Sequence, residues 1–334
     1  MPGVRGRGIE IREFILVNIA ECKNIAALTA KRFEISLPAV YKHIDRLVSE
    51  NQLIKKDGRY VLETKEYKYT YRNDKTLSED AVWEKDIKKH FTAVELNVRQ
   101  IWTYGFLEIF NNAIEHSRGN EIRVFISENR AGTALTIIDD GIGIFRNIKT
   151  NFNLIDEKDA LIELAKGKRT TDKKRHSGQG IFFTSKAFDE FMIISNGIEF
   201  CSNPDKDIKP GAGRKKYSTL VYMSIKNNSV KILKNIFDEF STELPGDFDK
   251  TIIPVRLANS EDLVSRSQAR RILSGLELFR EVILDFRDIE YIGQAFADEI
   301  FRVFTGINPN TVIKPQNANT DVQNMINRAV NTKL

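Results

Sequence analysis

Hydrophobic spacing in the first sixty residues changes from helical to extended. Residues 24–34 and 39–50 carry apolar side chains at helical spacing, which predicts two short amphipathic helices. Ser36 is suited to cap the second helix, and Pro38 fits its first turn. The pair Asp57-Gly58 then separates two extended runs and predicts a tight hairpin. This segment therefore predicts helix, turn, helix and hairpin, in that order.

The next stretch, residues 63–90, is dense in charge and poor in aliphatic side chains, which predicts a connector. Apolar positions over 82–91 predict that it becomes helical at its end. Aromatic and basic residues interleave over 67–72. That interleaving fits an edge strand with alternating faces, and it also fits a surface that stacks on single-stranded nucleic acid.

The middle of the chain predicts a helix, a hairpin and a loop. Residues 106–116 read as a helix, residues 121–128 alternate between apolar and polar, and 134–138 form a second strand that leads into Asp139. The strand ends in two consecutive acids, which is unfavourable in a core unless a partner satisfies them. The loop after the second strand is therefore a candidate for chemistry.

The last ninety residues alternate strand and helix, which indicates an α/β unit. The predicted strands cover 252–257 and 282–286. The predicted helices cover 261–279, 291–304 and 317–330.

Composition narrows the class of protein. With 334 residues, of which 41% are hydrophobic, the chain is long enough for two or three domains that each have a core. Cys22 and Cys201 stand far apart and there are four histidines, so neither a disulfide framework nor a zinc site is indicated. No apolar run is long enough to span a bilayer, and the first residues lack the apolar core of a signal peptide. We expect a cytoplasmic protein without a membrane segment. The net charge of +5 weakly favours an anionic partner such as nucleic acid.

Candidate chemistry gathers in the central helix and the loop after the hairpin. Glu108 and Asn112 are four apart and share one helix face, so a carboxylate can polarise a water while an amide oxygen binds Mg²⁺. Asp139 supplies a second carboxylate, and Gly141 and Gly143 let the backbone approach a flat ligand.

Three segments in this order resemble the motifs of the GHKL ATPases, the family of gyrase B, MutL and the histidine kinases. Residues 106–116 resemble the N box, 139–143 the G1 box and 177–181 the G2 box. The resemblance implies ATP and Mg²⁺ as cofactors. It also implies that Asp139 accepts a hydrogen bond from the adenine amino group and that Thr219 completes adenine binding. The alternative is that Thr219 lies in a strand only because its β-branched side chain favours that conformation.

The stretch between the two glycine motifs is basic. Six lysines and arginines, beginning at Lys166, precede Gly178 and Gly180 and suggest a phosphate funnel. In GHKL proteins this stretch is the ATP lid, which implies phosphate contacts from Lys168 and Arg169. The alternative is a solvated basic loop.

Glu108 determines which phosphoryl chemistry is expected. Sensor histidine kinases commonly have asparagine at this position, whereas hydrolysing GHKL members and anti-sigma serine kinases have glutamate. A carboxylate can orient water or a hydroxyl for attack on the γ-phosphorus. His90 and His116 lack the helical context of a phosphoacceptor. ATP hydrolysis or Ser/Thr phosphorylation is therefore favoured over histidine phosphorylation.

The N-terminal segment resembles a winged helix-turn-helix DNA-binding domain, in which the second helix enters the major groove. Its first sixty residues hold 11 lysines and arginines against 7 acids. The resemblance implies DNA contacts from the basic and aromatic residues of the second helix and the wing, namely Tyr41, Lys42, Arg46, Lys55, Lys56 and Arg59. The alternative is a winged helix used for dimerisation or protein contact.

The C-terminal unit resembles a STAS-like domain of the kind found behind GHKL domains. Phosphorylatable STAS domains have a serine at the helix start after the central strand, whereas this chain has 292–296, without a hydroxyl. We therefore expect a docking or dimerisation role for this unit rather than phosphorylation there.

Together these patterns predict a mixed α/β multidomain chain of a winged helix, a Bergerat-type α/β sandwich ATPase and a small α/β STAS-like domain. The predicted divisions are 1–65 for the winged helix, 66–92 for a connector, 93–245 for the ATPase and 246–334 for the STAS-like domain. The expected function is an ATP-binding, homo-oligomeric regulator that couples Mg-ATP binding or hydrolysis to DNA binding and to a protein partner. The alternatives are an anti-sigma-like Ser/Thr kinase and an ATP-dependent component of a stress or phage-defence locus.

Overall fold

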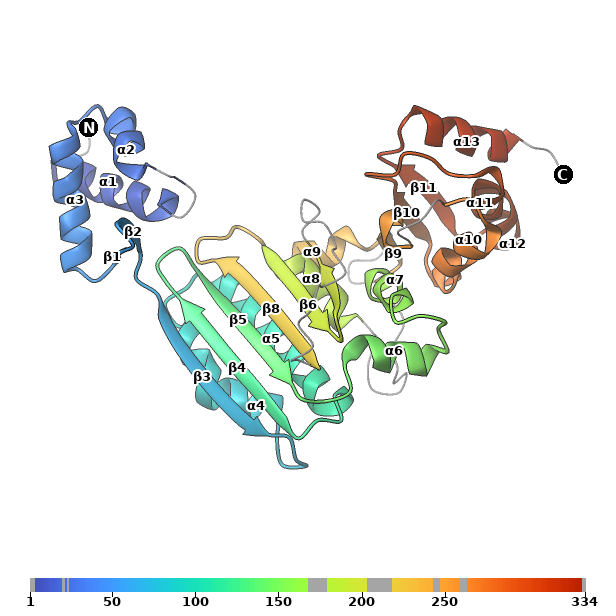
Figure 1. The fold of residues 1–334 in the computed structure, drawn as a ribbon, viewed down its shortest axis with the longest axis horizontal. Coiled ribbons are helices and arrows are strands. Elements are labelled where there is room, and N and C mark those ends of the chain that lie inside the picture. The colour runs from blue at the N-terminus through green and yellow to red at the C-terminus, as the bar shows by residue number, and fades with distance from the viewer. Residues whose placement is uncertain are drawn as a thin grey trace.

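The structure is a computed structural model of a mixed α/β chain. It describes residues 4–19, 22, 24–167, 179–202, 218–242, 247–258 and 263–331. The described residues form three β-sheets, which follow one another along the long axis of Figure 1.

The N-terminal unit consists of three helices and a hairpin. Its elements are α1 (Val4–Asn18), α2 (Ile25–Phe33), α3 (Leu37–Ser49), β1 (Leu53–Lys56) and β2 (Arg59–Leu62). Fully buried Ile15, Val40 and Ile44 hold the three helices together around one core. Ser36 caps α3 by accepting a hydrogen bond from the backbone N–H of Ala39 at 3.4 Å, as predicted.

The predicted hairpin turn is also confirmed. Asp57 and Gly58 have φ angles of 49° and 77° and join β1 to its antiparallel partner β2. Two consecutive left-handed residues give the tight turn whose twist matches that of the flanking strands.

The central unit is built on a six-stranded antiparallel sheet with the order β3-β4-β5-β8-β6-β7. Its strands are β3 (Lys65–Arg72), β4 (Glu121–Glu128), β5 (Gly132–Asp139), β6 (Glu190–Ser195), β7 (Ile198–Cys201) and β8 (Thr219–Lys226). Residues 67–72, part of the stretch expected to be a connector, therefore lie in an edge strand of this sheet, as the alternating pattern indicated.

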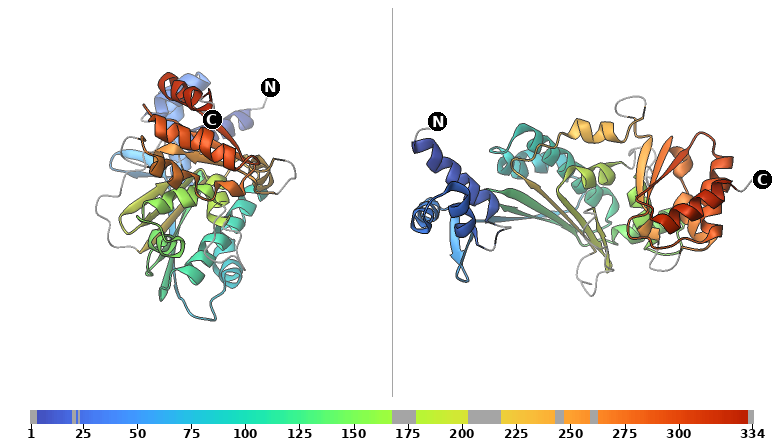
Figure 2. Two further views of the ribbon diagram at one scale, coloured as in Figure 1. Left: turned by 90° about the vertical axis from the view of Figure 1, so that its right-hand side faces the viewer. Right: turned by 90° about the horizontal axis from the view of Figure 1, so that it is seen from above.

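Helices cover one face of this sheet (Figure 2). They are α4 (Glu79–Val82), a π-helical turn (Trp83–Ile87), a 3₁₀ turn (Lys88–Phe91), α5 (Leu96–His116), α8 (Gly180–Ala187) and α9 (Leu233–Glu239). Helix α5 fills the core beneath the sheet with the fully buried rings of Trp102, Phe106 and Phe110. Gly105 lets α8 approach closely, since a Cβ there would collide with the ring of Phe188.

Two further helices, α6 (Ile144–Phe152) and α7 (Asp159–Lys166), follow β5 at the edge nearest the C-terminal unit (Figure 1). Helix α7 contributes Ile162 and Ala165, and α8 contributes Phe182 and Phe183, to the hydrophobic core of the C-terminal unit. Helices α7 and α8 therefore each pack into the cores of both units.

The C-terminal unit has a parallel sheet with the order β11-β10-β9. Its elements are β9 (Lys250–Pro254), a 3₁₀ turn (Val255–Ala258), α10 (Arg266–Leu273), a 3₁₀ turn (Leu276–Leu278), β10 (Glu281–Asp285), α11 (Gln294–Asp298), a π-helical turn (Glu299–Phe304), α12 (Thr305–Ile307), β11 (Val312–Gln316) and α13 (Thr320–Asn331).

Three sequence expectations for this unit need correction. The strand expected over 252–257 ends at Pro254, where the chain turns into the 3₁₀ helix. The helix expected up to residue 279 ends at Leu273, because the left-handed Gly275 (φ 83°) breaks it. Strand β11 was not expected; its proline, Pro315, is tolerated because β11 is an edge strand. Within the described part of the chain, no helix is both long and apolar enough to cross a bilayer.

Candidate functional site

Asp139 and Thr219 lie side by side at the ends of the two central strands of the sheet. Asp139 ends β5 and Thr219 begins β8, and the antiparallel register of the two strands pairs them directly. Each residue is only 6% exposed. The Oγ1 atom of Thr219 also accepts a hydrogen bond from the backbone N–H of Ile144 at 3.2 Å, which fastens the start of α6 to β8. The fold thus brings together the two residues that the sequence proposed for one ligand.

The Asp139 carboxyl is held in an unfavourable environment for a charge. Burial, with a smaller contribution from the neighbouring Asp140, raises the pKa of Asp139 to about 6. The backbone N–H of Gly141, which donates to Asp139 Oδ1 at 2.9 Å, and the Thr219 hydroxyl oppose this shift. A buried carboxyl with a raised pKa, located where a strand opens into a glycine loop, is typical of a functional site rather than of a core.

Asp140 has a different task. Its Oδ1 atom accepts hydrogen bonds from the backbone N–H groups of Asn120 and Glu121, at 2.7 and 3.0 Å. Asp140 therefore ties the loop before β4 to the loop after β5. Of the two consecutive acids, Asp140 is exposed and bonds the neighbouring loop, whereas Asp139 is buried beside Thr219.

Both glycines of the loop occupy positions where a side chain would not fit. A Cβ at Gly141 would strike the main chain of Ser117, at the end of α5, and the next residue, Ile142, donates its N–H to Ser117 O at 2.8 Å. Gly143 has a φ of 91° and lies against the side chain of Asn196. The loop is thereby pressed onto the C-terminal end of α5.

Glu108 and Asn112 lie one turn apart on α5, and both are half-buried. The Glu108 carboxyl contacts Gly180, the first residue of α8, so closely that a Cβ at position 180 would overlap Glu108 Oε2. A carboxylate at a helix N-terminus is stabilised by the helix dipole and the free N–H groups there. The structure therefore brings Glu108 together with one of the two predicted glycines of the last motif.

The contact between Glu108 and Gly180 predicts that a side chain at position 180 is unfavourable. Replacing glycine by alanine in a helix ordinarily stabilises it by roughly 0.5 to 1 kcal/mol, but Gly180→Ala should destabilise the chain by about 1 kcal/mol, because the Glu108 carboxyl must move away from the new methyl group. Urea unfolding midpoints would measure the change. Gly306→Ala, in α12, is the matched control, since a Cβ there meets nothing within 4 Å.

The double variant Gly180→Ala/Glu108→Ala should recover the stability lost in Gly180→Ala, because it removes the carboxyl that the new methyl group strikes. Equal destabilisation by Gly180→Ala with and without Glu108 would show that the two residues are not in contact.

Three predicted site residues, Lys168, Arg169 and Gly178, lie outside the described residues. The prediction that Lys166 belongs to a phosphate-binding funnel is wrong. Its side chain is 1% exposed and forms an ion pair with Glu163 at 2.7 Å, because α7 packs it into the core of the C-terminal unit.

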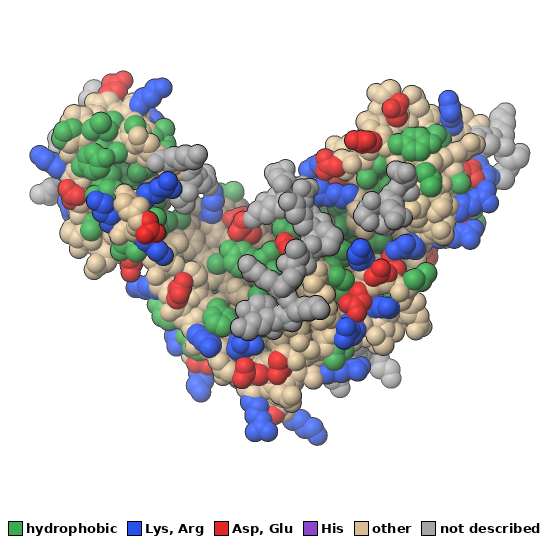
Figure 3. Space-filling model, in the orientation of Figure 1, with side chains coloured by type: hydrophobic (Ala, Val, Ile, Leu, Met, Phe, Trp, Pro, Cys, Tyr) green, Lys and Arg blue, Asp and Glu red, His purple; other side chains and the backbone are tan. Residues whose placement is uncertain are grey.

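The predicted DNA-contacting residues are all exposed on the N-terminal unit. They are Tyr41, Lys42 and Arg46 on α3, Lys55 and Lys56 on β1, and Arg59 on β2. Arg46 forms an ion pair with Glu50 at 2.8 Å, one turn along the same helix. On the face drawn in Figure 3, lysine and arginine side chains of this unit are interspersed with hydrophobic ones.

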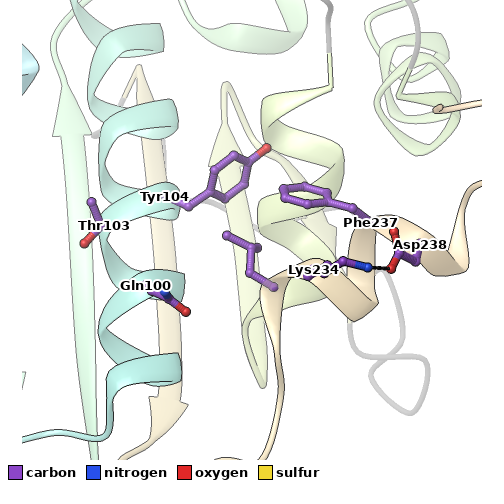
Figure 4. Close-up of a pocket in the computed structure, with 7 residues that line it drawn as sticks. Gln100, Thr103, Tyr104, Lys234, Phe237 and Asp238 are labelled. Atoms are coloured by element: carbon purple, nitrogen blue, oxygen red, sulfur yellow. Dashed lines mark hydrogen bonds and ion pairs between the residues drawn. The ribbon is translucent and has the colours of Figure 1, made fainter. Parts of the chain in front are cut away.

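A separate pocket of about 640 Å³ opens between α5 and α9. Tyr104 and Phe237 pack edge to face in its lining, with ring centroids 5.4 Å apart, and Lys234 and Asp238 form an ion pair at its rim (Figure 4). Tyr104 lies one helical turn before Glu108, and burial raises the pKa of its hydroxyl far above the ordinary value. Sequence reasoning missed Tyr104, because a single tyrosine on an apolar helix face gives no signal of its own.

Comparison with known families identifies only the C-terminal unit. Residues 268–323 match the model of a family described as a STAS-like domain of unknown function (DUF4325). The chain carries a STAS-like domain. The match spans β10, α11 and β11, which agrees with the strand and helix alternation of this unit. A search of curated proteins found no match to the chain.

Proposed function

We propose that this chain is an ATP-dependent regulator, in which a GHKL-type nucleotide site is joined to a DNA-binding winged helix and a STAS-like docking domain. The observation that carries the proposal is the buried Asp139 carboxyl, paired with Thr219 and followed by two glycines that admit no side chain. The arrangement offers a hydrogen-bond acceptor for an amino group beside a surface that a flat base can approach.

Adenine recognition follows from the chemistry of Asp139. An ionised carboxyl only accepts hydrogen bonds, so it suits the exocyclic amino group of adenine and disfavours the carbonyl oxygen of guanine. The Thr219 hydroxyl has one donor, which bonds Asp139 here, so to bond a ring nitrogen beside that amino group it would turn from Asp139 to the base. ATP is therefore preferred to GTP at this site.

Magnesium would enter with the nucleotide. Among the described residues, no cluster of three or more His, Cys, Asp or Glu could hold a metal ion. Mg²⁺ commonly takes one or two protein oxygens and completes its shell with phosphates and water. The amide oxygen of Asn112 fits this role, and the bound ion would neutralise phosphate charge during transfer.

Glu108 is the proposed general base. Its carboxylate orients a water molecule and accepts a proton as the water oxygen bonds to the γ-phosphorus. The bond between that phosphorus and the bridging oxygen breaks, which leaves ADP and inorganic phosphate. A serine or threonine hydroxyl in place of water would give a phosphoprotein, which is the kinase alternative.

The N-terminal unit supports DNA binding through its element order and its exposed cations. Three helices followed by a hairpin are the elements of a winged helix-turn-helix, in which α3 would enter the major groove. The cations of β1 and β2 would then contact the phosphate backbone.

Replacing Lys42 and Arg46 together by alanine should weaken DNA binding and flatten its salt dependence. Each lost phosphate contact lowers the slope of log K against log salt by about 0.9. Fluorescence anisotropy on a duplex, measured over a salt series, checks this. Lys314→Ala, on the STAS-like domain, is the control. An unchanged slope in the double variant would favour a winged helix that binds protein.

The STAS-like domain is proposed to dock a protein partner. The position where a phosphorylatable serine would be expected is close-packed: a Cβ at Gly293 would lie 2.7 Å from the main-chain Cα of Val264. Gly293 also donates its N–H to Leu263 O at 2.8 Å. Regulation by phosphorylation at the start of α11 is therefore disfavoured, and a fixed docking surface is favoured.

The test of this function is ADP release from Mg-ATP by the purified full chain, with and without duplex DNA. ADP release that DNA stimulates would link the nucleotide site to the N-terminal unit. Transfer of the γ-phosphate to an added protein would instead favour the kinase.

A further inference from the structure

Lys166, at the end of α7, is held by the STAS-like domain. Its ammonium donates hydrogen bonds to Glu163 Oε1 at 2.7 Å and to the backbone carbonyls of Ser274 at 2.7 Å and Arg271 at 3.3 Å. An ammonium has three N–H donors, so Lys166 can bond all three of these oxygens at once. Both carbonyls belong to the C-terminal end of α10, so Lys166 joins two helices that are far apart in the sequence.

Two further contacts hold α7 against the same domain. The hydroxyl of Thr251, in β9, donates to the backbone carbonyl of Lys166 at 3.2 Å. Arg271, in α10, forms an ion pair with Asp159 at the start of α7. Both ends of α7 are therefore bonded to the STAS-like domain, and α7 is expected to move with it.

The contact continues from α7 to the catalytic candidate. Gly167, which follows Lys166 directly, has a φ of 77° and lies against Phe182 of α8; a Cβ at Gly167 would be 2.5 Å from that ring. Two residues before Phe182, Gly180 contacts the carboxyl of Glu108. The position of α8 thus depends on the end of α7 on one side and sets the space for Glu108 on the other.

A set of aromatic rings makes a second connection between the same parts. Phe279 of the STAS-like domain contacts Phe248, which contacts Phe183 of α8, with ring centroids 5.3 and 5.0 Å apart. Phe183 contacts Phe237 of α9 at 4.6 Å, and Phe237 contacts Tyr104 at 5.4 Å (Figure 4). Tyr104 and Glu108 lie one turn apart on α5.

We propose that Lys166 is a positioning residue through which the STAS-like domain sets the placement of α8 against Glu108, and thereby the rate of ATP turnover. The predicted effect on turnover rests on the proposed function. The mechanical part, which is the dependence of α8 on Lys166, does not rest on it. Buried ion pairs add little net stability compared with apolar packing, whereas they specify one geometry. A lysine that bonds two backbone carbonyls of another helix fixes the register between the two helices.

The main test variant is Lys166→Met/Glu163→Gln in the full chain. It keeps the side-chain volumes and removes both charges, so no lone buried carboxylate remains. Thr251→Val is a milder variant, nearly isosteric, that removes only the hydrogen bond to Lys166 O. Lys314→Met is the matched control, since it removes an exposed ion pair with Glu281 on the same domain.

Hydrogen exchange without nucleotide tests the mechanical part. We expect amide exchange in α8 and in residues 104–112 of α5 to rise about tenfold in the main variant, and less in Thr251→Val. The Lys314→Met control should match wild type. Faster exchange confined to α7 and α10, with α8 and α5 as in wild type, would overturn the proposal. If the main variant does not fold, Thr251→Val decides in the same way.

Steady-state kinetics tests the effect on turnover. A displaced base lowers kcat by about 10- to 100-fold, while Kd for Mg-ATP stays within about threefold, because Asp139 and Thr219 are not displaced. Unchanged kcat in a variant with loosened α8 would overturn the regulatory role. If wild type neither binds nor hydrolyses ATP, the proposed function fails, and the exchange experiment still decides whether the STAS-like domain positions α8.

Discussion

Asp139→Asn should make the nucleotide-free protein more stable and its complex with ATP weaker. The wild-type carboxyl is ionised at pH 8 despite its burial, with a pKa raised to about 6 from 3.8. At about 1.36 kcal/mol per pKa unit, that ionisation costs about 2 to 3 kcal/mol of folding free energy, which asparagine removes. The side-chain oxygen of asparagine can still accept the hydrogen bond from Gly141. Its side-chain NH₂ group, however, is a donor and cannot accept a hydrogen bond from the adenine amino group.

The stabilisation by Asp139→Asn should depend on pH with a definite sign. Below pH 4 the carboxyl is protonated in both the folded and the unfolded chain, so wild type and variant should be alike. Between about pH 4 and pH 6 the unfolded chain loses its proton first, so wild-type stability falls relative to the variant as pH rises. Above about pH 6 the difference is constant.

Chemical denaturation at several pH values measures this difference, and calorimetric titration measures the loss of ATP affinity, expected at about 1 to 3 kcal/mol. Asp140→Asn is the matched control. Its carboxyl is exposed and accepts two backbone hydrogen bonds, so its replacement should bring no gain in stability. If the Asp139→Asn variant bound ATP as tightly as wild type, Asp139 would not be part of the adenine site.

Glu108→Ala should abolish turnover and leave ATP binding intact. A general base contributes about 10²- to 10⁴-fold to the rate, whereas the proposed adenine contacts come from Asp139 and Thr219, which are on other elements. Glu108→Ala shortens the side chain that contacts Gly180, so it introduces no clash with α8. Rapid-quench measurement of phosphate release, beside equilibrium binding of Mg-ATP, separates the two effects.

The control for Glu108→Ala is Glu115→Ala, an exposed acid later on the same helix. It should keep both turnover and binding. Retained turnover in Glu108→Ala would mean that the attacking group is activated elsewhere.

The sequence predicted those elements whose signals are local. The β4–β5 hairpin and the β1–β2 turn were found because alternation and an Asp-Gly pair specify them without help from the rest of the chain. The pairing of Asp139 with Thr219 is different in kind, since it depends on the register of strands separated by 80 positions. The sequence itself indicated Asp139, but Thr219 and the joining of the two residues in one site came only through a family resemblance.

The role of Lys166 could not be read from the sequence. It precedes a basic stretch, and the sequence therefore suggests a phosphate contact for it. In the structure it donates to the backbone carbonyls of Arg271 and Ser274, more than a hundred residues away. Backbone carbonyls carry no sequence signal. For the same reason, the shared core of α7, α8 and the STAS-like domain was not expected, since the hydrophobic positions of α7 are equally suited to either neighbour.

The most direct test of the central claim is calorimetric titration of the purified full chain with Mg-ATP and, separately, with Mg-GTP. We expect saturable binding of ATP at one site per chain and much weaker binding of GTP, because the Asp139 carboxylate would accept from the adenine amino group and repel the guanine carbonyl. Equal affinity for both nucleotides, or no binding of ATP, would contradict it.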